Sequence, residues 1–232
     1  MIDTPLLAPE TEQQLLDLFI DEHAYELGVI SLRSRRVFPV FPEPRHLLLS
    51  PCAMQMIASL FLQVWSRFQF DRICAVATAG IPFATYACAQ GNIPLCYAFP
   101  QPRPQRNTLQ TYFSSFIELP LCPPLRLLLV DDASGWGQTK LPLIQGLHQE
   151  GWSITGILSI IEQGRVYLPW YQEQNICIRA LTSAKALLER LRVRNRISAE
   201  TYSLAMSWYT SSEDWFDTAS IAQQFWDSLE HR

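Results

Sequence analysis

The stretch L-L-L-V-D-D-A-S-G-W-G-Q-T, residues 127–139, decides the fold that we expect for this chain. Its four apolar residues predict a buried β-strand, and the acidic residues Asp131 and Asp132 follow that strand directly. A glycine-containing turn comes next and leads into a predicted helix. Amides of such a turn, together with a helix N-terminus, form a cradle for phosphate. Two carboxylates beside the cradle are suited to bind ribose hydroxyls or Mg²⁺. The alternative interpretation of this stretch is an ordinary strand–helix turn without a ligand.

Strand and helix patterns alternate on both sides of this stretch, from residue 50 to residue 191. The predicted strands are short apolar runs, and the segments between them have helical periodicity or capping signals. This alternation predicts an α/β fold with a mostly parallel central sheet and helices on both of its faces. The predicted strands cover residues 73–78, 95–98, 125–130, 153–161 and 175–181.

The two ends of the chain have patterns of their own. A predicted helix and two short extended segments, 29–32 and 37–41, precede the alternation, and prolines assign the second segment to an edge or a hood. The tail is rich in Trp and Phe and predicts one or two further helices. We therefore expect one domain over residues 1–194, with an N-terminal hood, and a helical extension over residues 195–232 packed on or next to it.

The composition excludes several classes of protein. A net charge of −4 over 232 residues gives no broad basic surface for nucleic acid. Residues 1–9 lack the pattern of a signal peptide, and no apolar run reaches the ~18 residues of a membrane span. Six cysteines form no Cys-x-x-Cys pair, and the four histidines match no metal spacing. We therefore expect a cytoplasmic protein with no nucleic-acid or membrane partner and no dedicated metal-ligand cluster.

In this arrangement the chain resembles the type I phosphoribosyltransferases, and among them the orotate phosphoribosyltransferases. Residues 127–139 are similar to the family's motif for phosphoribosyl pyrophosphate (PRPP), in which a strand ends in two acidic residues. The likeness covers about residues 10 to 191 in order. It also includes A-V-A-T-A-G-I-P (75–82), G-V-I-S-L-R-S-R-R-V-F-P (28–39), I-I-E-Q-G (160–164) and L-T-S-A-K-A-L-L (181–188).

The resemblance implies transfer of a ribose 5-phosphate group from PRPP to a pyrimidine base, with Mg²⁺ as cofactor and a homodimer as the assembly. Asp131, Asp132 and Arg103 would be the catalytic residues, because carboxylates near the ribose and cations on the leaving pyrophosphate stabilise such a transition state. Ile161 would line the base pocket. The residues that would bind PRPP or its phosphates are Arg33, Thr78, Ala79, Gly80, Ser134, Gly135, Trp136, Gly137, Gln138, Thr139 and Lys140.

Several positions depart from the family's pattern. Arg33 stands where the family has a lysine, and Gly135-Trp136-Gly137 replaces Thr-Thr-Gly, which removes two hydroxyl donors. In the stretch that aligns with the family's mobile loop, Arg103 keeps a charge while most of the other cations are absent. Ile161 stands in the place of the arginine that binds orotate, and an aliphatic chain cannot pair with a carboxylate. These substitutions argue against turnover of orotate itself.

Three hypotheses for function therefore stay open. The chain is a divergent PRPP-binding phosphoribosyltransferase that uses another base, an inactive descendant that binds PRPP or a nucleotide and regulates, or a protein-binding scaffold or assembly factor. The retained Asp131-Asp132 pair and Arg33 favour ligand binding. The aromatic tail, the proline-rich segment 99–107 and Trp136 favour a protein partner, because Trp and Tyr often anchor interfaces.

Overall fold

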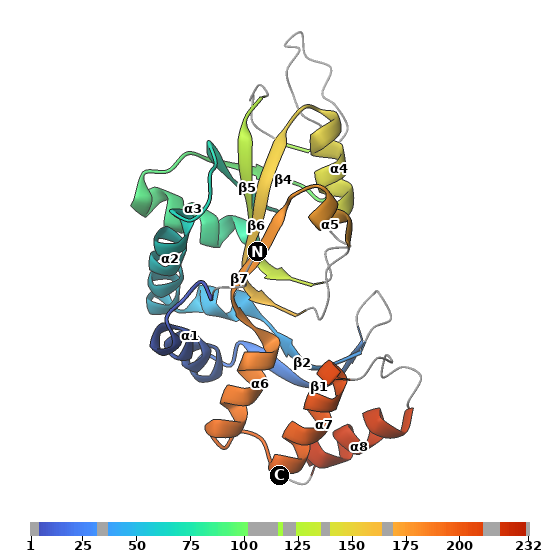
Figure 1. The fold of residues 1–232 in the computed structure, drawn as a ribbon. Helices are drawn as coiled ribbons and strands as arrows, with labels where there is room; N and C mark the ends of the chain where they lie inside the picture. The colour runs from blue at the N-terminus through green and yellow to red at the C-terminus, as the bar shows by residue number, and fades with distance from the viewer. Residues whose placement is uncertain are drawn as a thin grey trace. The chain divides into compact units, whose positions relative to one another are not determined.

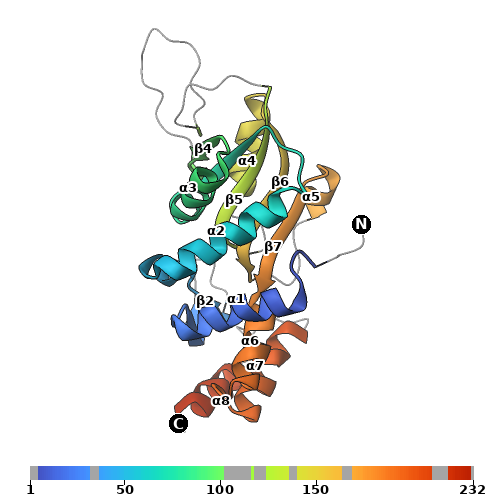
Figure 2. The ribbon, with the colours of Figure 1, turned by 90° about the vertical axis from the view of Figure 1, so that its left-hand side faces the viewer.

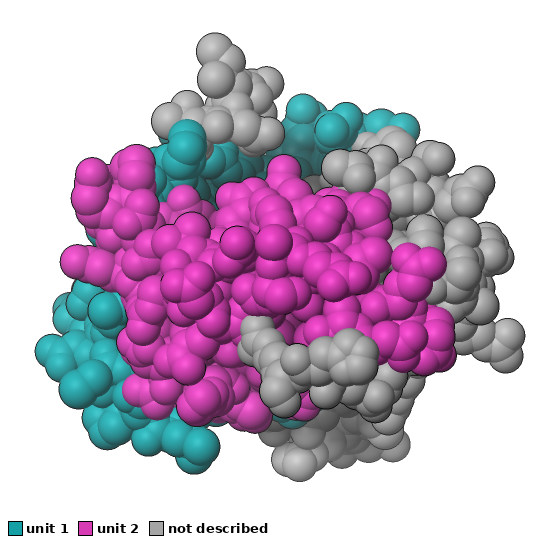
Figure 3. Space-filling view, turned by 90° about the horizontal axis from the view of Figure 1, so that it is seen from below, with its two compact units in different colours: residues 1–7, 48–181 teal, residues 8–47, 182–232 magenta. Residues whose placement is uncertain are grey.

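A computed structural model describes residues 5–31, 37–101, 116–117, 124–135, 140–163, 169–210 and 219–230. The contacts between residues divide the chain into two compact units, which Figure 3 colours separately. Unit 1 comprises residues 1–7 and 48–181, and unit 2 comprises residues 8–47 and 182–232. This division differs from the sequence-based boundary between residues 194 and 195, which stays a prediction.

Unit 1 is built on a five-stranded parallel sheet in the order β4-β3-β5-β6-β7 (Figure 1). Strand β3 (Arg72–Val76) pairs in parallel with β4 (Leu95–Ala98) and with β5 (Arg126–Ser134). Strand β5 pairs in parallel with β6 (Ser153–Glu162), and β7 (Cys177–Ser183) completes the sheet. The predicted α/β fold class is thereby confirmed.

Helices cover both faces of this sheet. Figures 1 and 2 show α2 (Pro51–Trp65) and α3 (Gly80–Gly91) over one face, and α4 (Leu141–Gln149) and α5 (Pro169–Glu173) over the other. The residues at the centre of β5, 127–130, are fully buried, which explains why their sequence is continuously apolar instead of alternating.

Helix α2 begins where the sequence predicts it. Ser50 is the N-cap, because its hydroxyl accepts a hydrogen bond from the amide of Ala53 at 3.4 Å. Pro51 follows at the first helical position, where its missing N–H costs nothing. The helix ends at Trp65. None of the helices in the described parts of the chain combines the length and the apolar character that crossing a membrane requires.

The strand order contains a switch point between β3 and β5. From β3 the chain passes through α3 to β4 on one side, and from β5 it passes through α4 to β6 on the other. In open α/β sheets, ligands bind at such a point, beyond the carboxyl ends of the two strands. The topology therefore indicates one place on the sheet edge for a binding site.

Unit 2 joins the N-terminal hood to the C-terminal helices. Strand β1 (Tyr25–Ser31) pairs antiparallel with β2 (Val37–Pro42), as expected for a proline-containing edge strand. The aromatic side chains Trp208 and Phe225 are buried, so neither offers an exposed anchor to a protein partner. The helical elements are α1 (Pro9–Asp21), the 3₁₀ helix η1 (Pro44–Leu49, which ends in unit 1), α6 (Ala184–Val193), α7 (Ala199–Thr210) and α8 (Ala219–Glu230).

Helix α6 is capped by the second of two adjacent hydroxyl residues. Thr182 is also suited to this role, but its hydroxyl donates to the Glu12 carboxylate at 2.9 Å. Ser183 is the N-cap instead, accepting from the amide of Ala186 at 3.1 Å. Because Glu12 on α1 accepts the hydrogen bond of Thr182, the neighbouring Ser183 caps the helix.

Candidate active site at the carboxyl edge of the sheet

The acidic pair lies within strand β5 and not after it. We expected the strand to end at Val130, but β5 continues to Ser134. Its last residues pair with β6, Asp131 opposite Ser159 and Ser134 opposite Glu162. Because β6 runs equally far, it supplies backbone partners that extend β5 beyond its apolar run. The backbone of the acidic pair is therefore fixed by the sheet.

Both oxygens of the Asp131 carboxylate have partners. The Lys140 ammonium lies 2.7 Å from Oδ2, and the Asp132 amide donates to Oδ1 at 2.9 Å. Lys140 also donates to the carbonyl of Ala133 at 2.9 Å. We expected Lys140 to face a phosphate, and the structure places its ammonium on the acidic strand. The lysine therefore fixes the orientation of the Asp131 carboxylate.

Asp132 is in a different electrostatic state from its neighbour. Burial, and then the negative charge and hydrogen bonding of Asp131, raise the pKa of Asp132 to about 7. The amide of Ala133 and the charge of Lys140 act in the opposite direction, but they do not outweigh the burial. The pair therefore combines one fixed carboxylate with one that exchanges a proton near neutral pH.

Gly80 brings a distant segment against the acidic pair. A Cβ atom on Gly80 would lie 2.6 Å from the carbonyl oxygen of Val130 and 2.9 Å from the Cα of Asp131, closer than real Cβ contacts allow. Only glycine permits this approach. Helix α3 begins at this point, and its N-cap residue, Ala79, makes no side-chain cap. The positive end of α3 therefore meets the carboxyl end of β5, with backbone amides suited to an anion.

The carboxyl end of β6 adds polar groups to the same edge. The hydroxyls of Ser134 and Ser159 lie 2.8 Å apart, and the amide of Gln163 donates to the carbonyl of Ser134 at 2.8 Å. Ile161, the predicted base-pocket residue, is fully buried opposite Ala133 in β5.

Gln163 is a site residue that the sequence does not single out. Only 8% of it is exposed, and its side-chain Nε2 has no hydrogen-bond partner within the described part of the chain. An unsatisfied buried donor costs about 1–3 kcal/mol, so a ligand acceptor would relieve a real penalty. The one available signal was the two-residue spacing from Ile161, which places both on one face of an extended chain.

The structure thus brings together part of the predicted site. Asp131, Asp132 and Lys140 meet at the end of β5, and Gly80 places the start of α3 against them. Thr78 is exposed just before α3, and a Cβ added to Gly135, which follows β5, would meet no atom of the described residues within 4 Å. The roles of these residues stay predictions. Six further predicted residues lie outside the described residues: Arg33, Arg103, Trp136, Gly137, Gln138 and Thr139.

The chain is similar in sequence to known orotate phosphoribosyltransferases. No protein-family model matches the chain. It is 25% identical over 210 residues to an orotate phosphoribosyltransferase of Listeria innocua, covering 84% of this chain and 96% of that protein. It is 22% identical over 184 residues to uridine 5′-monophosphate synthase of Bos taurus, covering 78% of this chain but only 37% of that longer protein. The expected resemblance to orotate phosphoribosyltransferases is confirmed.

Solved structures agree on the fold. The UMP synthase of Leishmania donovani superposes with a TM-score of 0.73 at 22% identity, covering 86% of this chain and 42% of that chain. The orotate phosphoribosyltransferase of Aeropyrum pernix gives 0.64 at 23% identity, covering 77% and 98%. That of Mycobacterium tuberculosis in complex with PRPP gives 0.57 at 15% identity, covering 76% and 98%. None of these likenesses favours a regulator or a scaffold over the transferase interpretation.

Proposed function

This chain is an orotate phosphoribosyltransferase-like protein with the type I phosphoribosyltransferase fold, and from this premise we propose that it transfers the 5-phosphoribosyl group of PRPP to a ring nitrogen of a base. The observation that carries the proposal is the contact at Gly80, which joins the start of α3 to Asp131 at the switch point of the sheet. Carboxylates and helix amides there match a ligand that combines ribose hydroxyls with phosphates.

The proposed reaction exchanges one bond at the anomeric carbon of the ribose for another. The C1–O bond to pyrophosphate breaks, a base nitrogen forms the new C1–N bond, and the base loses a proton. Positive charge builds on the sugar while negative charge builds on the leaving group. Asp131, held by Lys140, would face the sugar as a fixed anion, and the first amides of α3 would donate to anionic oxygens.

The donor set at the end of β5 fits Mg²⁺. This ion favours oxygen ligands and is commonly bound by one or two carboxylates together with substrate phosphates. Asp131 and Asp132 supply such a pair, and no group of three metal-ligating side chains occurs within the described ranges. These two residues would therefore hold the ion next to the ligand's own oxygens. When bound, Mg²⁺ would offset the charge that develops on pyrophosphate.

The base pocket favours a neutral ring over orotate. At the described carboxyl end of β6, Gln163 contributes an amide and Ile161 is fully buried, with no cation there to pair with a carboxylate. The unpartnered Nε2 of Gln163 would donate to a ring carbonyl. We propose a pyrimidine-type base without a carboxylate as the acceptor. We also propose that the protein works in the cytoplasm as a homodimer, as the resemblance suggests.

Calorimetric titration with PRPP, with and without Mg²⁺, tests the ligand. We expect micromolar affinity that falls about tenfold or more in Asp131→Asn and in Asp132→Asn, a change of roughly 1.4 kcal/mol. Glu189→Gln, which removes an exposed carboxylate from α6 in unit 2, is the matched control and should bind like the unaltered protein. If both site variants bind PRPP with unchanged affinity, Asp131 and Asp132 do not belong to the PRPP site.

Pyrophosphate release then tests the acceptor. Uracil, orotate and other bases would be compared at saturating PRPP. We expect a neutral pyrimidine to give a kcat/KM about tenfold or more above that of orotate, since a lost charge-assisted contact costs at least this much. If PRPP binds and no base releases pyrophosphate, the PRPP-binding regulator becomes the better hypothesis.

A further inference from the structure

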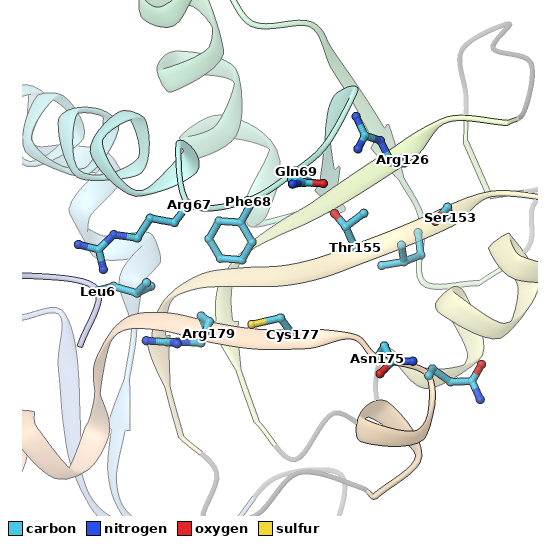
Figure 4. Close-up of a pocket in the computed structure, with 12 residues that line it drawn as sticks. Leu6, Arg67, Phe68, Gln69, Arg126, Ser153, Thr155, Asn175, Cys177 and Arg179 are labelled. Carbon is cyan, nitrogen blue, oxygen red and sulfur yellow. The ribbon is translucent and has the colours of Figure 1, made fainter. Parts of the chain in front are cut away.

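A pocket lies at the opposite edge of the unit 1 sheet from the candidate active site. Its volume is about 600 Å³, and the first residues of three strands, Arg126, Ser153 and Cys177, contribute to its wall (Figure 4). Because these strands run in parallel, their amino ends lie at the edge away from Asp131 and Gly80. The volume falls within the range of roughly 300–1,000 Å³ that is usual for small-molecule sites.

The wall of this pocket is cationic. Arg67, Arg126 and Arg179 line it, and among the described residues no aspartate or glutamate does. Asp71, outside the wall, holds Arg126 with a 2.8 Å ion pair. Arg67 donates to the carbonyl oxygen of Pro5 at 3.0 Å, a group without net charge. The carboxyl end of α2 adds only about half a negative charge nearby, which is less than one guanidinium supplies. The charge of Arg67 is therefore not offset by a described acidic side chain, which favours an anionic ligand.

Phe68 gives the pocket a fixed aromatic surface. The residue follows α2 in a turn in which its amide donates to the carbonyl of Trp65 at 3.0 Å. The ring lies over Gly156 in β6, where an added Cβ would come 3.3 Å from Cδ1 of Phe68. Since the sheet supports the ring from below, its position does not depend on a ligand. A half-buried ring of this kind is suited to stack on a planar heterocycle.

Groups of different chemistry lie on the two sides of that ring. Figure 4 shows Arg67 and Arg179 on one side of Phe68, and Gln69, Thr155 and Asn175 on the other. Arg126 also lies on that second side, where Asp71 pairs with its guanidinium. Guanidinium groups recognise phosphate through paired N–H donors. Amides and hydroxyls both donate and accept, as the edge of a nucleobase requires. The order across the pocket is therefore phosphate site, stacking surface and ring-edge site.

We propose that this pocket binds a mononucleotide, with its phosphate on Arg67 and Arg179, its base stacked on Phe68 and the edge of the base toward the amide side chains. This site goes beyond the proposed transfer reaction and does not require it. If the transfer takes place, its product is itself a nucleoside 5′-monophosphate. A molecule of the product class would then bind away from the site of chemistry.

Alkylation of Cys177 provides a readout that belongs to this pocket alone. Its thiol lies in the wall, whereas Cys52 is exposed at the start of α2 and serves as an internal control. The full chain would be treated with iodoacetamide and the modified peptides quantified by mass spectrometry. At a concentration of uridine 5′-monophosphate that fills about nine-tenths of the pockets, only about one-tenth of the Cys177 thiols stay accessible. We therefore expect modification of Cys177 to slow by about tenfold while that of Cys52 stays unchanged.

Ligand fragments and variants decide whether the proposed contacts are correct. Uridine lacks the phosphate and ribose 5-phosphate lacks the ring, so each should protect Cys177 only at concentrations about tenfold higher or more. Protection should weaken similarly in Arg67→Ala and Phe68→Leu. It should persist in Arg196→Ala, an exposed arginine in unit 2, and in Asp132→Asn, which separates this site from the proposed transfer.

Equilibrium dialysis gives an independent count of bound nucleotide. The Arg67→Ala/Arg179→Ala double variant should bind one uridine 5′-monophosphate fewer per chain than the unaltered protein, while its far-UV circular dichroism is kept. An equal count, or protection of Cys177 by ribose 5-phosphate at the same concentration as by the nucleotide, would overturn the proposal.

Discussion

The ammonium of Lys140 lies 2.7 Å from Oδ2 of Asp131, with side chains that are only 9% and 12% exposed. This ion pair joins the residue just before α4 to the end of β5. It also sets the charge of the site, because Asp131 and Asp132 are adjacent carboxylates in a largely dry environment. One cation there stabilises the first carboxylate and leaves the second to titrate.

Removing the lysine charge should therefore destabilise the fold. Lys140→Met leaves Asp131 buried and unpaired beside a second acid, and breaking a buried pair from one side costs about 3–5 kcal/mol. We expect urea denaturation at pH 8 to show a loss of that order in the free energy of unfolding. Lys185→Met, on the exposed face of α6, should change it by less than about 0.5 kcal/mol. Equal losses in the two variants would show that the pair is not stabilising.

The contact at Gly80 predicts an effect on both stability and binding. In Gly80→Ala the new Cβ would collide with the backbone of Val130 and Asp131, which cannot rotate away as a flexible side chain could. Helix α3 must then shift, at a cost of about 1–3 kcal/mol, and we expect PRPP affinity measured by calorimetry to fall with it. Gly135→Ala, whose Cβ would meet no atom of the described residues within 4 Å, is the stability control. Full stability in Gly80→Ala would contradict the close approach.

The sequence predicts the central sheet well because its signal is local. Residues 127–130 are apolar on both faces, and the helices on both sides of the sheet explain that pattern. The extension of β5 to Ser134 was not predictable, because Asp and Ser disfavour strands and only the length of β6 overrides them. The burial of Gln163 escaped prediction for a similar reason. A polar residue that ends a strand looks solvent-facing until its neighbours in space are known.

The raised pKa of Asp132 predicts how stability depends on pH in metal-free protein. The usual aspartate pKa is about 3.9, and the folded value is about 7, so the folded state holds a proton that the unfolded state releases. This contribution is fully present below pH of about 4 and is lost as the pH rises through 7. With EDTA present, the free energy of unfolding, relative to Asp132→Asn, should fall by about 4 kcal/mol across this interval. Parallel pH profiles of the two proteins would contradict a raised pKa.

Replacing Gln163 should raise the stability of the fold and lower the activity of the protein. Its buried Nε2 has no partner among the described residues, so Gln163→Met replaces an unsatisfied donor with an apolar chain of similar length. We expect the free energy of unfolding to rise by about 1 kcal/mol, because the desolvation penalty disappears.

The kcat/KM for the accepted base should fall about tenfold or more, while PRPP affinity stays unchanged, because the lost donor would face only the base. Gln55→Met, at an exposed glutamine of α2 outside both proposed sites, controls for the substitution itself. A loss of stability in Gln163→Met would mean that the amide has a partner within the fold, and its assignment to the base pocket would then fall.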